Sequence, residues 1–140
     1  MGSSITRVNA FVGVRGLSAG FDFGGAAVDV RAYNNIWFGN RVNTIDPGGG
    51  EHDYNWFFDN VRTEGCDPEC ILDTDAAAAE PNAELGSGDP FVAWQSGDFR
   101  LQAATAHGMT LPAPFDVDPM GAQRGADGVW DRAPHEYATR

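Results

Sequence analysis

Short apolar runs, each introduced by an asparagine, recur through the first sixty residues. They are Asn9-Ala10-Phe11-Val12, Asn35-Ile36-Trp37-Phe38 and Asn55-Trp56-Phe57-Phe58, and their asparagines lie 26 and then 20 residues apart. Phe11, Trp37 and Phe57 fall at the same offset, as side chains stacked on one another do. A solenoid with three short strands per coil completes one coil in roughly 20 to 26 residues. The pattern predicts parallel strands whose asparagines form a ladder.

Polar and apolar positions alternate in the segment between the first two runs, as in a half-buried strand. This alternation predicts that one set of side chains points inward, namely Phe21, Phe23, Val28, Val30 and Ala32. The outward set is Asp22, Asp29, Arg31 and Tyr33. Glycine and proline predict turns at residues 16–20, 24–27 and 46–50.

The periodic pattern stops after residue 61, where the sequence becomes acidic and poor in large apolar groups. We expect residues 62–89 to form a loop excursion, with one short helical turn at residues 75–79 capped by Asp75. Order returns at residue 90, and a last coil is expected through Phe99, Leu101 and a strand at Met109-Thr110-Leu111. The predicted organisation is one domain, 1–140, with coils at 5–61 and the last coil and cap at 90–140.

A parallel solenoid exposes unpaired backbone groups and apolar core at each end, so an end cover is expected. Residues 112–130 are rich in turns and contain Phe115, Val129 and Trp130 as apolar plugs for the carboxyl-terminal end. Arg124 is expected to pair with Asp116, Asp118 or Asp131. No comparable cover is visible near the N-terminus, which predicts missing coils or a homo-oligomer formed through that end.

Composition supports a folded chain and excludes some partners. The 140 residues are 42% hydrophobic and include 18 glycines and 8 prolines, which favours many short strands over a few long helices. The formal net charge is -11 with no lysine. Nucleic acid is therefore not an expected partner, and anionic membranes or polymers are opposed unless a divalent cation bridges the charges.

The last forty residues carry a family resemblance. The order of short apolar pairs, aspartate turns, one arginine and a final acidic-aromatic pair resembles the closing segment of bacterial right-handed parallel β-helix proteins, the pectin-lyase-like superfamily. The residues that carry it are Gly97-Asp98-Phe99-Arg100-Leu101, Asp116-Val117-Asp118-Pro119-Met120-Gly121, Arg124, Asp131-Arg132 and Glu136-Tyr137. The resemblance implies an all-β, right-handed parallel β-helix with three strands per coil and a C-terminal cap.

The chain departs from the family pattern at two places. His107 precedes Gly108 where an aspartate is common, and Ala133-Pro134-His135-Glu136 stands where Gly-Ala-Tyr-Glu is common. Pro134 cannot donate to a strand ladder, which affects the pairing of a final strand.

The resemblance also implies an extracellular or cell-surface location. The first residues lack the apolar run and cleavage pattern of a secretory signal, and no window approaches the length that spans a membrane. We therefore expect no membrane partner, and we interpret the chain as a piece of a longer exported protein.

The superfamily is rich in polysaccharide lyases, glycoside hydrolases and glycan-binding proteins, so polysaccharide is the expected partner. The outward strand face would bind it, through Asp29, Arg31, Tyr33, His52 and Asp53. A lyase would use Arg31 or His52 as cation or base, and a hydrolase would pair Asp29 with Asp53. Neither pattern is specific, so no catalytic residue is assigned. We expect a non-catalytic β-helix segment; the alternatives are an enzyme whose catalytic coils are missing and a self-assembling structural module.

Two further features concern ions and cysteines. Calcium is conceivable at Asp73-Thr74-Asp75 or within residues 46–53, where oxygen ligands are dense, and no other cofactor is expected. Cys66 and Cys70 are the only cysteines. They could close a small loop as a disulfide in an oxidising compartment or remain free thiols.

Overall fold

The computed structural model describes residues 4–7, 9–15, 18–20, 29–46, 50–62, 64 and 70–137. This part of the chain consists mostly of short strands with one short helix, so the all-β prediction is confirmed. The first nine strands are β1 (Ser4–Arg7), β2 (Ala10–Val12), β3 (Ser18–Gly20), β4 (Asp29–Tyr33), β5 (Ile36–Phe38), β6 (Thr44–Asp46), β7 (Glu51–Asp53), β8 (Trp56–Phe58) and β9 (Val61–Arg62). The later elements are β10 (Cys70–Ile71), α1 (Asp73–Ala78), β11 (Glu84–Leu85), β12 (Phe91–Ala93), a 3-10 turn (Trp94–Ser96) and β13 (Asp98–Leu101).

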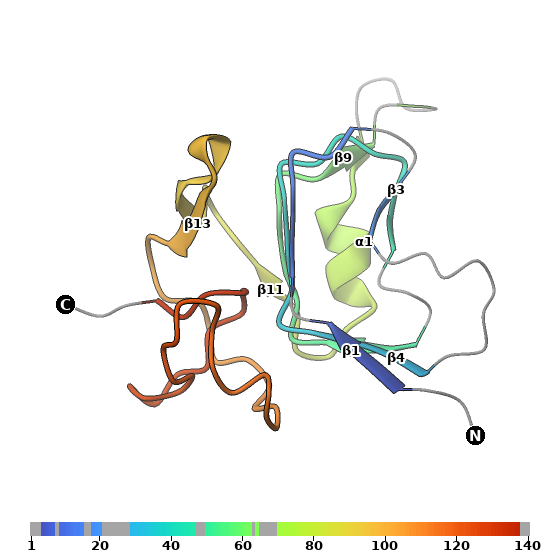
Figure 1. The fold of residues 1–140 in the computed structure, drawn as a ribbon. Helices are drawn as coiled ribbons and strands as arrows, with labels where there is room; N and C mark the ends of the chain where they lie inside the picture. Colours follow the sequence, from blue (N-terminus) through green and yellow to red (C-terminus); the bar gives the residue numbers. More distant parts are fainter. Residues whose placement is uncertain are drawn as a thin grey trace.

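Strands β1 to β5 and β8 each pair in parallel with a strand that follows about one pass later. The sheets are β1-β4-β7, β2-β5-β8-β11 and β3-β6. The predicted register is confirmed: Phe11 pairs with Trp37, and Trp37 pairs with Phe57. We call the strands of residues 4–62 the strand stack. Figure 1 views it nearly end-on, so that the blue, teal and green passes trace overlapping outlines.

At two corners of the stack, the described passes use one residue each in the left-handed conformation. At one corner these residues are Asn34 (φ 60°) and Tyr54 (φ 58°), and each precedes an inward asparagine. At the next corner they are Gly13, Gly39 and Asp59, with φ between 57° and 68°. Asparagine, aspartate and glycine tolerate this conformation better than other residues, so the local sequence favours the bend. The predicted turn at residues 16–20 is wrong in part, because Ser18–Gly20 forms β3.

Large aromatic side chains fill the interior of the stack. The rings of Phe11 and Trp37 stack with centroids 4.9 Å apart, and those of Trp37 and Phe57 stack at 5.4 Å. Trp37 is fully buried and Phe57 nearly so. Leu72, Ala76 and Ala77 pack against this cluster. Helix α1 therefore lies over the last pass, and Figure 1 shows it within the outline of the stack.

The helix corrects two expectations for residues 62–89. It spans Asp73–Ala78, and its N-cap residue is Leu72, with no side-chain capping bond, rather than Asp75. Strand β11 then pairs in parallel with β8, Glu84 beside Trp56. The segment predicted as a loop excursion thus closes one end of the stack and adds a short strand to its largest sheet.

Residues 90–101 do not form the expected last coil. Strands β12 and β13 pair antiparallel, with Phe91 opposite Leu101, so they form a hairpin. Phe91 and Leu101 pack on Ile36, Phe38 and Trp56, on the face of the largest sheet opposite the Trp37 stack. Hairpin formation is the outcome when two short strands are joined by one tight turn, here the 3-10 turn with Gly97 at φ 87°.

The tail, residues 102–137, lies beside the stack and not over its end (Figure 1). It contacts the stack at a corner, where Tyr33 packs with Leu111 and Trp130, and on the face of the largest sheet, where Ala133 packs in the cluster with Ile36. Asn34 accepts a hydrogen bond from the backbone N–H of Met109 at 2.8 Å and donates its side-chain amide to the Met109 carbonyl at 2.8 Å. The expected strand at residues 109–111 is absent from this described segment. The prediction that the tail plugs the carboxyl-terminal end is wrong, because α1 occupies that position.

Candidate functional site

The first asparagine ladder ends on a buried glutamate. Asn55 Oδ1 accepts hydrogen bonds from the backbone N–H and the side-chain amide of Asn35, both at 2.9 Å. One pass later, Glu80 takes the same position. Its carboxylate accepts the backbone N–H of Asn55 at 3.1 Å and the Asn55 side-chain amide at 2.7 Å. The Glu80 side chain is 1% exposed.

The second ladder ends in the same way at the next corner. The Asn40 side-chain amide donates to Asn60 Oδ1 at 2.7 Å. Asn60 in turn donates its side-chain amide to Asp73 Oδ1 at 2.6 Å and its backbone N–H to Asp73 Oδ2 at 3.3 Å. Burial raises the pKa of the Asp73 carboxyl above its usual value, and the hydrogen bonds from Asn60 partly counter that shift.

These two carboxylates stop the ladders for a simple chemical reason. An asparagine amide both accepts and donates hydrogen bonds, so the donors of each rung need an acceptor on the next rung. An ionised carboxylate accepts only, so Asp73 and Glu80 satisfy the last rung and present no donor onward. The two residues lie at the two ends of α1 and its following turn, and the helix covers the apolar interior between them.

The structure brings together two of the five predicted carbohydrate-binding residues. Arg31 and Tyr33 lie on the outer face of β4, and both meet Glu51 of β7: the Tyr33 hydroxyl donates to Glu51 Oε2 at 2.6 Å, and Arg31 Nε lies 4.0 Å from the same oxygen. Tyr33 is 9% exposed because the tail packs against it. Asp29 begins β4, and its side chain is not among those described.

The other two predicted residues have different surroundings. Asp53 accepts hydrogen bonds from the backbone N–H and the side-chain amide of Asn82, both at 2.8 Å, and so holds the turn before β11. His52 lies between outward Glu51 and Asp53 in the strand and faces the interior side, where its Nδ1 is 2.8 Å from Glu80 Oε2. His52 therefore lies on the other face from Arg31 and Asp53. The pairing of Asp29 with Asp53 stays a prediction, because the Asp29 side chain lies outside the described residues.

A cavity of about 270 Å³ lies beside this histidine, between α1 and strands β6 and β7. Ile45, Phe57, Leu72 and Ala76 form its apolar wall. His52 and Glu80 line it as well.

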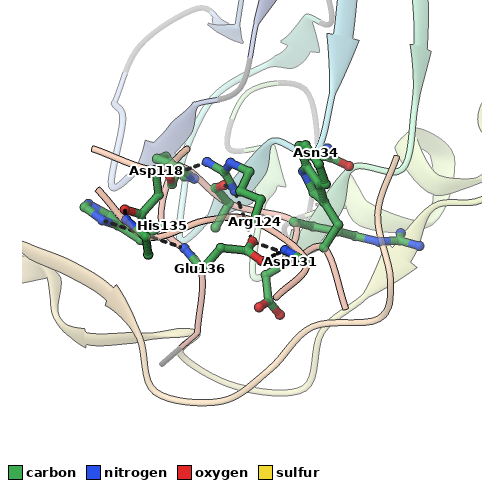
Figure 2. A network of polar contacts seen from close by, with 12 residues as sticks. Asn34, Asp118, Arg124, Asp131, His135 and Glu136 are labelled. Carbon is green, nitrogen blue, oxygen red and sulfur yellow. Dashed lines mark hydrogen bonds and ion pairs between the residues drawn. The ribbon is translucent and has the colours of Figure 1, made fainter. Parts of the chain in front are cut away.

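The tail is held by a network of charged side chains around Arg124 (Figure 2). Arg124 Nη1 donates to Glu136 Oε2 at 3.2 Å and to the Ala133 carbonyl at 3.0 Å. Glu136 also accepts the backbone N–H groups of Gly125 and Asp131, both at 2.8 Å. The expected partners of Arg124 were Asp116, Asp118 or Asp131, and its ion-pair partner in the structure is Glu136.

Burial shifts the acid-base behaviour of this network. Desolvation raises the pKa of the Asp131 carboxyl, and hydrogen bonds from Thr105 and Tyr137 partly counter it. Desolvation likewise raises the pKa of Glu136 and lowers that of Arg124, while the charges of Glu136 and Asp118 raise the arginine pKa again. The network buries several charges to hold a segment with little regular secondary structure.

The described residues bear on the calcium and cysteine expectations. Asp73 is committed to Asn60 and Asp75 is exposed, so the two do not share an ion site. Within the described ranges, no three His, Cys, Asp or Glu side chains come together as possible metal ligands. Residues 47–49 lie outside those ranges, so calcium within 46–53 stays a prediction. Cys70 is disulfide-bonded and accepts a hydrogen bond from Arg62 at 3.8 Å, while Cys66 lies outside the described residues.

The comparisons with known proteins give no relative. No family model matches the chain, and neither the curated proteins nor the solved structures contain a significant match. The pectin-lyase-like resemblance therefore stays a prediction. Among the described residues, no helix has the length and apolar character needed to cross a membrane.

Sequence reasoning missed the residues that organise the end of the stack. Asp73 is predicted only as a calcium ligand, and no role is predicted for Glu80. Glu80 lies 25 residues after Asn55, close to the ladder spacing, whereas Asp73 lies only 13 residues after Asn60 and breaks it. The alternation of polar and apolar positions does not mark Asp73 and Glu80, because they lie at the start of a helix and just after it, and not on a strand.

Proposed function

We propose that this chain is a non-catalytic end segment of a right-handed parallel β-helix, within a secreted or cell-surface protein that associates with polysaccharide. One observation carries the proposal: parallel passes in register are followed by a helix whose flanking carboxylates accept the donors of both last rungs. Such a construction ends a stack of coils and keeps its edge from pairing with other chains.

The glycan association rests on the outer face of β4 and β7. Arg31 is 45% exposed and Glu51 68% exposed in their side chains, and they lie beside the Tyr33 ring. Arginine and carboxylate side chains can hydrogen-bond sugar hydroxyls, and the buried Tyr33 holds Glu51 in place through its hydroxyl. Arg31 can also pair with the carboxylate of a uronate, which partly offsets the acidity of the chain.

Binding to immobilised polygalacturonate, alginate and a neutral glucan tests the proposal. We expect the chain to bind at least one uronate polymer without releasing unsaturated sugar, and Arg31→Ala to weaken binding at least about fivefold. Arg100→Ala, which removes an exposed arginine on the hairpin, is the control and leaves binding unchanged. Equal effects of the two variants, or no binding to any polymer, would refute the glycan role.

The same preparation separates the alternative functions. Release of unsaturated sugar would favour a lyase. A mass that rises with concentration would favour assembly through the first pass, whose strands β1, β2 and β3 are each paired on one side only among the described strands.

A further inference from the structure

The cavity between α1 and strands β6 and β7 has a size and lining suited to a small organic molecule. Its volume of about 270 Å³ is close to the lower end of the range for ligand pockets, roughly 300–1,000 Å³. Ile45, Phe57 and Leu72 give it an apolar wall. This wall is separate from the outer face of β4 and β7, so the inference does not depend on the glycan proposal.

One polar atom of the cavity lining is an acceptor that lacks a donor. Asn43 Oδ1 is buried and has no hydrogen-bond partner among the described residues. The amide nitrogen of the same side chain donates to Glu64 at 2.9 Å. His52 Nδ1 lies 2.8 Å from Glu80 Oε2, so this nitrogen already has a partner. A ligand that satisfies Asn43 Oδ1 must bring an N–H or O–H donor.

The charge at the cavity selects among such ligands. Asp75 and Glu80 line it, and no described arginine does. The whole chain carries a formal net charge of -11. A carboxylate or phosphate ligand would be repelled, whereas a cation would be attracted. An ammonium group has three donors and no acceptor, which matches a lining that presents acceptors.

We propose that this cavity binds a small primary amine with an apolar body. The hydrocarbon part packs on Ile45, Phe57 and Leu72. The ammonium group takes the position nearest Asn43 and Asp75, where it supplies the donor that Asn43 Oδ1 lacks. Glu80 holds His52 in place and keeps its own hydrogen bonds to Asn55.

Three soluble probes of similar size test the proposal on the full chain: 2-phenylethylamine, 2-phenylethanol and phenylacetate, each titrated by calorimetry and by NMR. We expect the amine to bind about tenfold more tightly than the alcohol, as a charged hydrogen bond predicts, and phenylacetate not to bind. NMR shifts on amine binding should centre on His52 and Asn43. Equal affinity for amine and alcohol, or no binding of the amine, would overturn the proposal.

Two neighbouring alanines on α1 and its C-terminal cap give a matched pair of variants. Ala79 lines the cavity and Ala78 does not, and both are exposed. Ala79→Phe should block the cavity and abolish amine binding, while Ala78→Phe leaves it unchanged. Asp75→Asn preserves the volume and should weaken the amine several-fold without changing the alcohol. Amine binding that survives Ala79→Phe would place the ligand elsewhere and overturn the assignment.

Discussion

The strand stack and the tail solve the same problem, the satisfaction of buried polar groups, by opposite means. The stack repeats one neutral device: asparagines 20 residues apart bond to each other, as Asn35 does to Asn55 and Asn40 to Asn60. The tail uses single charged groups, with Arg124 and Glu136 holding backbone atoms from several turns. When one of several neutral amide bonds weakens, the stack loses little stability. When one member of a buried charge network is removed, the other charges are left uncompensated and the loss of stability is larger.

The largest expected effect is on the tail. Arg124→Met removes the cation that faces Glu136 and leaves buried carboxylates without compensation, which should lower the free energy of unfolding by about 3–5 kcal/mol. Hydrogen exchange should show protection lost at Gly125 and Asp131, whose N–H groups bond to Glu136, before it is lost at Trp56 in the stack. Arg100→Met, at an exposed ion pair, is the control and should change nothing measurable. Uniform loss of protection across both regions would contradict the contrast.

A smaller effect is expected when one rung of the ladder is removed. Asn55→Ala leaves Asn35, Glu80 and the Ala32 carbonyl each without one partner, which should cost roughly 2–3 kcal/mol in urea unfolding. Asn82→Ala is the control, because Asn82 is exposed and lies outside the ladders; it should cost no more than about 1 kcal/mol. If both substitutions cost the same, the ladder contributes nothing special to the stack.

The smallest effect concerns pH. The pKa values of Asp73, Glu84, Asp131 and Glu136 are raised by burial, so the folded chain binds protons more tightly than the unfolded chain. Their contribution is fully present below the ordinary values near 4 and is lost as the pH rises through the raised values. Stability should therefore increase on mild acidification from pH 7, by about 1.4 kcal/mol at most for each unit of pKa shift.

Two variants and one opposing group sharpen the pH test. Asp131→Asn and Asp73→Asn should each flatten the urea-unfolding stability curve between pH 7 and 5, one in the tail and one at the end of the stack. Asp98 acts in the opposite sense, because hydrogen bonds from Arg100 lower its pKa to about 2; its contribution is small because the pair is exposed, and it is lost as the pH falls from about 4 towards 2. Stability that falls steadily from pH 7 to 5 would refute the assignment.

The sequence predicted the stack far better than what surrounds it. The recurring Asn and aromatic positions gave the register of Phe11, Trp37 and Phe57, because every pass places the same residue types at the same corner. The closure of the stack was not predictable from that repeat, since a helix delivers Asp73 and Glu80 at irregular spacing.

The candidate surface was predicted only in part, for a related reason. Strand alternation correctly placed Arg31 and Tyr33 on one face, but it also places His52 on the other face from Glu51 and Asp53, and the prediction grouped them. The role of Asp53 depends on Asn82, which is 29 residues away in the sequence and belongs to no repeat. The ion pair of Arg124 with Glu136 likewise follows from the path of the tail, which has no periodic signal.

The acceptor-only ends of the two ladders give the stack a direction. In each rung the asparagine donates its hydrogen bonds toward the carboxyl-terminal side. An extra pass of 20 residues inserted between β9 and α1 would therefore need the same acceptors for the donors of its last rung. The helix and its two carboxylates should therefore end a longer stack of the same rungs in the same way as they end this one.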